Sequence, residues 1–265
     1  IANQYLALAK YTASVKAEAI PLERNRMQVN IYVEEGTISR IKEINIVGNR
    51  LYNKEALLTP FNLKVTNLLS WWNKDDRYSK QVLSGDLEKL RSFYMDRGYL
   101  DFKINTSLIR ISENKKNVYI DISITEGNKY LIADSQLSGN YENVPEALLQ
   151  AQIGTRAGQA FNRSEVTATT SRLNQILGDY GYAFSNANAI PDIDKEARTV
   201  SFNYFVDPGK KIYVRRINIF GNEKTKDKVI RRELRQFESS WYAKNKIDRS
   251  KSRLSATPYF DNIDV

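Results

Sequence analysis

Two pairs of adjacent carboxylates are the side chains in this sequence that come nearest to a catalytic or metal-binding group. Glu34-Glu35 and Asp75-Asp76 could act as an acid and a base, or bind a divalent cation, if both carboxylates of a pair reached the same point. Adjacent residues of an extended chain point to opposite sides, however, and neither pair has an evident third ligand. We therefore expect both pairs to be solvent-exposed charges.

The composition removes most other catalytic chemistry. The 265 residues include no histidine and no cysteine, so the commonest general base, the commonest metal ligand and thiol nucleophiles are all missing. We expect neither an enzyme nor a cofactor or metal ion. No apolar run approaches the roughly 20 residues of a membrane-spanning helix, and residues 1–5 lack the features of a signal peptide, so we expect a water-soluble, processed or excised segment.

The net charge of +9 could indicate a nucleic-acid or anionic-membrane partner. Lys and Arg are dispersed among Asp and Glu, as in residues 224–233, and we interpret them as solvated surface charges. The adjacent Trp71 and Trp72 could form a recognition loop, but adjacent indoles more often anchor a loop on a core, so we favour core packing.

A repeat of domain size organises the chain. Gly-Asn pairs at Gly48, Gly139 and Gly221 each follow a strand-like segment, at intervals of 91 and 82 positions. The pairs Glu35-Gly36, Glu126-Gly127 and Pro208-Gly209 each close an alternating strand and recur at the same intervals of 91 and 82 positions. Intervals of this length are typical of small domains rather than of solenoid repeats.

The elements between these markers follow from hydrophobic periodicity. Apolar residues alternate along 27–33, 118–124 and 200–206, which predicts three half-buried strands. Apolar residues at helical spacing from Leu83 to Tyr94, and from Val166 to Tyr180, predict helices that end at Gly98 and Gly181. Asn162 and Glu165 predict a capping box at the start of the second helix. In the last repeat, Ile230, Leu234 and Phe237 predict a shorter first helix.

Each unit is therefore predicted to be α+β, with the order β-α-α-β-β and a three-stranded mixed sheet that carries two helices on one face. We expect residues 38–127 and 129–209 to be complete modules. Residues 1–36 should be the C-terminal part of a preceding module, and residues 211–265 the N-terminal part of a following one. The chain is thus expected to be a fragment of a longer protein.

The module order, the Gly-Asn turns and the Gly-Tyr helix ends resemble the polypeptide-transport-associated (POTRA) domain of the Omp85 family over the full length. The strings that carry this resemblance include Gly85-Asp86-Leu87-Glu88, Asp96-Arg97-Gly98-Tyr99, Ile124-Thr125-Glu126-Gly127 and Tyr213-Val214-Arg215. The resemblance implies five modules before a membrane barrel, with this chain covering the end of the second, the third, the fourth and most of the fifth. We use these ordinals as names.

The resemblance also implies a function and a location. It implies the periplasmic part of an outer-membrane protein of a Gram-negative-type bacterium, acting as a scaffold that assists the folding and insertion of β-barrel proteins. The implied partners are unfolded outer-membrane β-barrel proteins, BamB-like and BamD-like accessory lipoproteins, and the chain's own membrane barrel beyond residue 265; no nucleic acid is expected.

Two kinds of candidate site follow. A three-stranded sheet has two edges whose unpaired backbone groups can bind an extended polypeptide, and the resemblance places the strand after the second helix at an edge. The candidate docking residues are Phe102, Lys103, Ile104, Asn105, Thr106, Ser107, Leu108 and Ile109 in the third module, and Phe184, Ser185, Asn186 and Ala187 in the fourth, where the strand is expected to run to Ile190. By the same resemblance, Glu233 matches a position that contacts a lipoprotein partner through a salt bridge.

Two other functions stay open at this point. The POTRA region of a two-partner secretion transporter would bind one dedicated exported protein, although four visible modules exceed the two expected of it. A basic RNA-binding array of KH-like modules would need a Gly-x-x-Gly clamp; the nearest candidate, Gly154 to Gly158, is one residue too long.

Overall fold

The computed structural model describes residues 13–23, 26–35, 38–67, 75–141, 143–260 and 262–264. The chain divides into two compact units, residues 1–129 and 130–265. Among the described residues, no helix has both the length and the apolar character that crossing a membrane would require.

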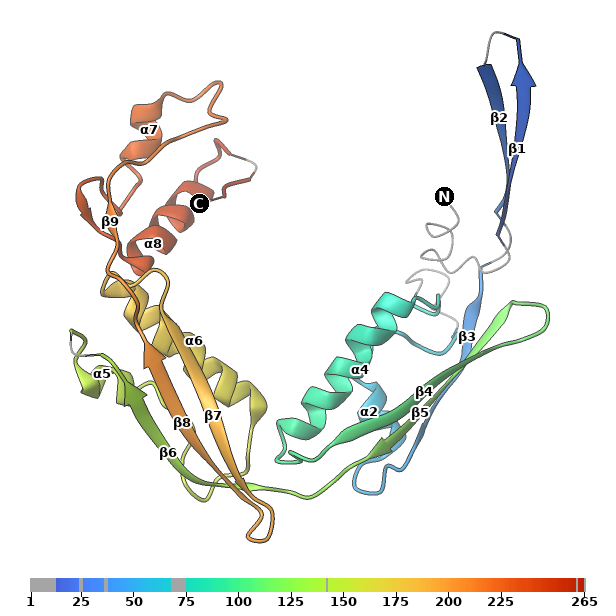
Figure 1. The fold of residues 1–265 in the computed structure, drawn as a ribbon, viewed down its shortest axis with the longest axis horizontal. Coiled ribbons are helices and arrows are strands. Elements are labelled where there is room, and N and C mark those ends of the chain that lie inside the picture. Colours follow the sequence, from blue (N-terminus) through green and yellow to red (C-terminus); the bar gives the residue numbers. More distant parts are fainter. Residues whose placement is uncertain are drawn as a thin grey trace. The chain divides into compact units, whose positions relative to one another are not determined.

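The first unit opens with a hairpin. Strands β1 (Ser14–Leu22) and β2 (Arg26–Glu34) pair antiparallel (Figure 1). The predicted strand is present as β2, but its residues do not alternate in burial, because Met27, Val29 and Ile31 are 65%, 55% and 50% exposed. As the C-terminal part of a module, residues 1–36 should begin inside its second helix. That helix would fall in residues 1–12, outside the described residues, so this expectation stays untested.

The third module contains β3 (Arg40–Val47), α2 (Lys54–Leu58), α4 (Lys80–Met95), β4 (Lys103–Ile111) and β5 (Asn117–Thr125). The sheet order is β3-β5-β4, with β5 parallel to β3 and antiparallel to β4. Val118, Ile120 and Ile122 of the central strand are fully buried, and they share one core with Leu57 of α2 and Leu90 of α4. Both helices therefore cover the same face of the sheet (Figure 1).

The fourth module repeats this arrangement with β6 (Leu131–Gly139), α5 (Glu146–Gln150), α6 (Arg163–Asp179), β7 (Asn186–Asp194) and β8 (Thr199–Asp207). The order β6-β8-β7 again combines a parallel and an antiparallel pair, so the predicted α+β fold class is confirmed. Asn162 caps α6 by accepting a hydrogen bond from the Glu165 N–H at 2.9 Å, whereas the Glu165 carboxylate pairs with Arg172 at 2.6 Å.

Two of the three Gly-Asn markers have a steric explanation, whereas a Cβ atom on Gly221 would meet no other atom of the described residues within 4 Å. Gly48 and Gly139 have φ values of 99° and 106°, in the left-handed region. A Cβ atom on either residue would lie 2.1 Å from the carbonyl oxygen of Ile124 or Val206, respectively. Only glycine lets the chain turn this close to the central strand.

The fifth module has β9 (Tyr213–Val214), α7 (Asp227–Arg231), β10 (Ser240–Trp241) and α8 (Lys244–Ser255), with β10 antiparallel to β9. The predicted helix through Phe237 is wrong, because α7 ends at Arg231 and Phe237 is 60% exposed. Beyond α7 the Arg235 N–H donates to the Ser250 hydroxyl of α8 at 2.7 Å. Ser250 of α8 thus accepts a hydrogen bond from a backbone N–H that would bond within α7 if α7 continued to Phe237.

Candidate functional site

The first strands of both complete modules are partly covered edges. The Ile41 N–H of β3 donates to the Asp76 carbonyl, and the Ile41 carbonyl accepts from the Thr66 N–H. In β6 the Ile132 N–H donates to the Gln159 carbonyl in the same way. Loop backbone therefore already occupies the start of each of these edges.

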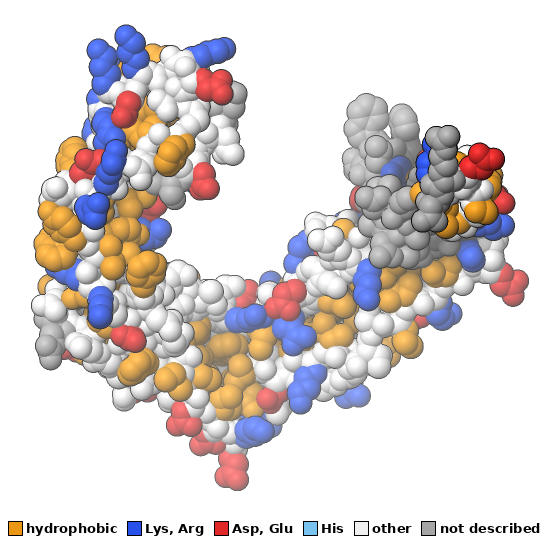
Figure 2. All heavy atoms as spheres, turned by 45° about the horizontal axis from the view of Figure 1, so that its top comes forward, with side chains coloured by type: hydrophobic (Ala, Val, Ile, Leu, Met, Phe, Trp, Pro, Cys, Tyr) orange, Lys and Arg blue, Asp and Glu red, His pale blue; other side chains and the backbone are white. Residues whose placement is uncertain are grey.

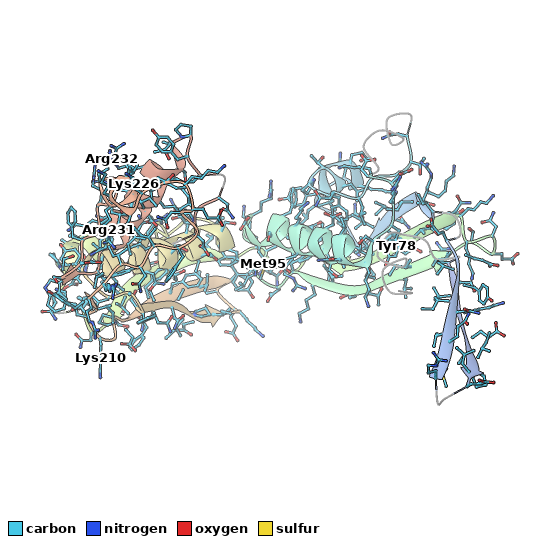
Figure 3. The ribbon with its side chains drawn as sticks, turned by 90° about the horizontal axis from the view of Figure 1, so that it is seen from above. Tyr78, Met95, Lys210, Lys226, Arg231 and Arg232 are labelled. Carbon is cyan, nitrogen blue, oxygen red and sulfur yellow. The ribbon has the colours of Figure 1, made fainter. Side chains whose placement is uncertain are left out.

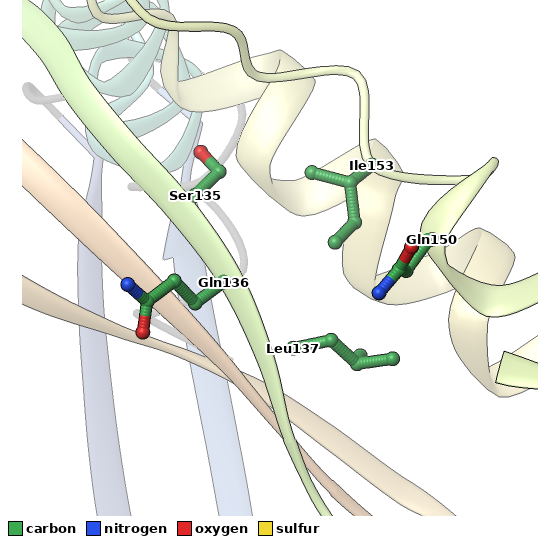
Figure 4. Close-up of a pocket in the computed structure, with 5 residues that line it drawn as sticks. All are labelled: Ser135, Gln136, Leu137, Gln150 and Ile153. Carbon is green, nitrogen blue, oxygen red and sulfur yellow. The ribbon is translucent and has the colours of Figure 1, made fainter. Parts of the chain in front are cut away.

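A cavity of about 500 Å³ lies beside the later part of β6. It is lined by Ser135, Gln136, Leu137, Gln150 and Ile153, from β6, α5 and the loop after α5 (Figure 4). The Ser135 hydroxyl lies 2.7 Å from that of Thr155, which lies 3.0 Å from the Tyr204 hydroxyl. All five lining residues are uncharged, three of them polar and two apolar.

Strand β4 presents a long edge. Among the described strands it pairs only with β5, and its nine residues include no proline. The N–H of Ser112, which follows β4, donates to the Asn117 carbonyl across the ladder. Because successive residues of a strand alternate in direction, the N–H groups of Ser107, Ile109 and Ile111 face away from β5. They form a row of three outward donors.

Strand β7 presents a weaker edge. Its Ala187 N–H is taken by the Asn174 side chain of α6 at 3.0 Å. The same alternation turns Ala189, Pro191 and Ile193 outward, and proline has no N–H to donate. Pro191 pairs with Phe202 where, in the third module, Ile109 pairs with Ile120. Ile109 and Pro191 are thus matched positions on the two edges.

Three of the candidate docking residues do not lie on the edge strands. Phe102 precedes β4, is 3% exposed and stacks on Tyr94 with ring centroids 4.4 Å apart. Phe184 and Ser185 precede β7, and Phe184 is 81% exposed. The predicted starts of both strands are therefore wrong, by one residue for β4, where Phe102 packs in the core, and by two residues for β7. Lys103 to Ile109 lie on β4, and Asn186 and Ala187 lie on β7.

Glu233 lies just beyond α7 rather than within the predicted helix. Its side chain is 17% exposed and pairs with Arg253 of α8 at 2.6 Å and with Arg232 at 3.3 Å. The hydrogen bond from Arg253 is the main cause that lowers the pKa of the Glu233 carboxyl below its usual value. Figure 3 shows Lys226, Arg231 and Arg232 near α7.

The two pairs of adjacent carboxylates differ in how exposed they are. Glu34 and Glu35 are exposed, as predicted. The prediction is wrong for Asp76, which is 1% exposed and pairs with Arg40 at 2.8 Å. Among the described residues there is no group of three or more Asp, Glu, His or Cys side chains that could bind a metal ion. Trp71 and Trp72 lie outside the described residues.

Sequence reasoning assigned no role to Glu126, and the structure gives it one. The Glu126 carboxylate is 8% exposed and accepts hydrogen bonds from the Tyr94 hydroxyl at 2.7 Å and from the Leu51 N–H at 3.1 Å. It therefore ties the turn after Gly48 to α4. Burial first, and then the bond to Glu126, raise the pKa of the Tyr94 phenol.

Two observations bear on the RNA-binding alternative. Lys and Arg are interspersed with Asp, Glu and apolar side chains over the visible face (Figure 2). The N–H groups of Gly154 and Gly158 are bonded to the Thr169 hydroxyl and the Ile132 carbonyl. They are consequently not available to hold a phosphate, and this segment does not form a KH-like clamp.

The repeat of the same three-stranded module decides the family. A family model described as "POTRA: Surface antigen variable number repeat" matches residues 39–127, 130–209 and 212–265. The chain belongs to the POTRA family. The resemblance seen in the sequence motifs is confirmed.

Individual relatives agree with this assignment. The outer membrane protein assembly factor BamA of Neisseria meningitidis is 33% identical over 98% of this chain, and that of Buchnera aphidicola is 31% identical over 100% of it. The chain spans only 33% and 43% of the lengths of these two relatives. The crystal structure of Haemophilus influenzae BamA POTRA3-5 matches with a TM-score of 0.73 at 22% identity, covering 86% of this chain and 89% of that one. The POTRA fold is therefore shared with BamA.

Proposed function

We propose that this chain is the periplasmic scaffold segment of a BamA-type outer-membrane assembly protein of a Gram-negative-type bacterium. In this role it binds unfolded β-barrel proteins in extended form and holds them for folding and insertion, without catalysing a reaction. The names of its relatives support the assembly role. The module boundaries 1–36, 38–127, 129–209 and 211–265 are part of the same proposal, and the family-model matches support them.

The observation that carries this proposal is the edge of β4. Backbone hydrogen bonds give affinity without selecting a side-chain sequence, which suits a protein with many different clients. The outward N–H groups of Ser107, Ile109 and Ile111 would pair with the added strand. The exposed Leu108, at 60%, would contact one face of that strand. In β7, Pro191 interrupts the corresponding row, so we assign docking to β4.

The matched positions allow a reciprocal experiment. An Ile109→Pro substitution removes one outward donor without breaking the ladder to β5, and edge strands tolerate proline at such positions. We expect the affinity for a fluorescently labelled peptide from a β-barrel strand to fall about tenfold or more, since a bound strand loses at least one backbone bond. Ile109→Ala, which keeps the donor, is the control and should bind like the parent.

The converse substitution, Pro191→Ala, restores a donor on β7 and should create a weaker second binding site. Fluorescence anisotropy measures both effects, and circular dichroism verifies the fold of each variant. Equal peptide affinity in Ile109→Pro and Ile109→Ala would overturn docking on β4.

Glu233 is proposed as the contact for a BamD-like lipoprotein, while a BamB-like lipoprotein is proposed as a further partner without an assigned residue. Because Glu233 already pairs with Arg253, a partner cation would have to share its carboxylate. A Glu233→Lys substitution should weaken lipoprotein binding by reversing this charge, and Arg253→Ala should remove the shorter of the two ion pairs of Glu233, keep the pair with Arg232, and strengthen or preserve binding. Unchanged affinity of Glu233→Lys in a pull-down titration would remove the assignment.

A further inference from the structure

Helix α8 of the fifth module begins without a capping side chain of its own. Its first N–H groups have no partner within the helix, and Ser, Thr, Asp or Asn usually supplies one from the residue before the helix. Here that residue is Ala243, whose backbone is extended as at an ordinary cap but whose side chain cannot accept a hydrogen bond. The N-terminus of α8 therefore needs an acceptor from elsewhere.

The acceptor comes from the preceding module. Asp179 is the last residue of α6, and its Oδ1 atom accepts a hydrogen bond from the Asn245 N–H at 2.7 Å. Asn245 is the second residue of α8, which is the position that an ordinary cap would bond. The negative charge also lies at the positive end of the α8 dipole. Asp179 thus acts as the N-cap of α8, although the two bonded residues are 66 positions apart in the sequence.

The surrounding contacts bring the two modules together at the same place. A Cβ atom on Gly178 would lie 3.0 Å from the Lys244 Cβ, so α6 and α8 approach closely there (Figure 1). The Ile212 N–H of the connecting segment donates to the Gly181 carbonyl at 2.8 Å. The Asp179 bond is therefore one of several contacts that join the two modules.

We propose that Asp179 is a positioning residue that fixes the fifth module against the fourth by capping α8. The same helix carries Arg253, which pairs with Glu233 at 2.6 Å. Asp179 thereby sets the orientation of the surface on which Glu233 lies. This inference does not depend on what Glu233 or β4 binds.

The test separates capping from positioning. The chain has no cysteine, so exposed Lys195 and Lys251 can be changed to cysteine and spin-labelled, one in each module. Asp179→Ala should broaden the distance distribution between the labels by about twofold, because inter-domain motion is the default when a joint loosens. The matched control, Asp192→Ala on the exposed part of β7, should leave the distribution narrow.

A second variant keeps the test decisive if α8 frays. Adding Ala243→Ser to Asp179→Ala provides a local cap, and hydrogen exchange at Asn245, expected to be about five times faster in Asp179→Ala, should return toward the parent rate. The distance distribution should stay broad. A narrow distribution in Asp179→Ala, or its return to the parent width in the double variant, would overturn the positioning role.

Discussion

Removing the hydroxyl group of Tyr94 should destabilise the third module and leave the fourth unchanged. Tyr94 is fully buried, and its hydroxyl donates to the buried Glu126 carboxylate at 2.7 Å. Hydrogen bonds to charged groups contribute about 1.5–3 kcal/mol. Glu126 keeps its bond from the Leu51 N–H in the Tyr94→Phe variant, so we expect a loss of about 2 kcal/mol, the middle of that range.

Hydrogen exchange followed by mass spectrometry resolves this loss by module in the intact chain. A loss of about 2 kcal/mol corresponds to exchange about 30 times faster for the most protected amides of β5, whereas β8 should not change. Tyr119→Phe, on the opposite face of β5, is the control. In a double-mutant cycle with Glu126→Gln, the destabilisation of the double variant should be smaller than the sum of the destabilisations of the two single variants. Equal acceleration in both modules, or full additivity, would refute the reasoning.

Three further predictions follow from local contacts. Burial raises the pKa of Tyr94 and Tyr204 above the unfolded value of about 10. The contribution of these two phenols to stability should therefore be fully present below pH 10 and lost as the pH rises above it. Coinciding urea midpoints at pH 8 and pH 11 would contradict this. Gly139→Ala places a Cβ atom 2.1 Å from the Val206 carbonyl oxygen and should cost more than about 2 kcal/mol by urea denaturation; a smaller cost would mean that the turn can shift. Asn162→Ala should cost about 1 kcal/mol in the fourth module by losing the α6 cap, and unchanged exchange in α6 would argue against the cap.

Periodicity was a sufficient guide to the modules because their central strands are covered by helices on one face. In β5 the alternation of buried and half-buried residues follows the sequence pattern residue by residue. The left-handed Gly98 and Gly181, with φ values of 102° and 104°, likewise end the helices where predicted. Local signals succeed where the local structure and the core require the same residue.

Contacts between distant residues were not predictable from pattern. Asp76 was expected to be exposed because the Asp75-Asp76 pair had no evident third ligand, yet it pairs with Arg40 across 36 positions. The helix predicted through Phe237 is shortened because Ser250 of α8 binds the backbone that follows α7. No sequence spacing indicates that Asp179 would cap the helix of the next module.

Pro191 is informative in the sequence, and the prediction of docking strands did not use it. Pro191 directly follows the strand predicted for the fourth module, which was expected to run to Ile190, and a proline on an edge strand indicates which N–H groups face outward. The register of both sheets was needed to match Pro191 with Ile109. With the two positions matched, β4 has an outward N–H at Ile109 where β7 has none at Pro191, and this difference predicts which edge binds a strand.

Residue-resolved hydrogen exchange with and without a bound barrel-strand peptide tests docking on β4 most directly. Saturating peptide should protect the amides of Ser107, Ile109 and Ile111, and should leave those of Ala189 and Ile193 on β7 unchanged. Unprotected β4 amides at saturation, or protection that appears on β7 instead, would contradict the account.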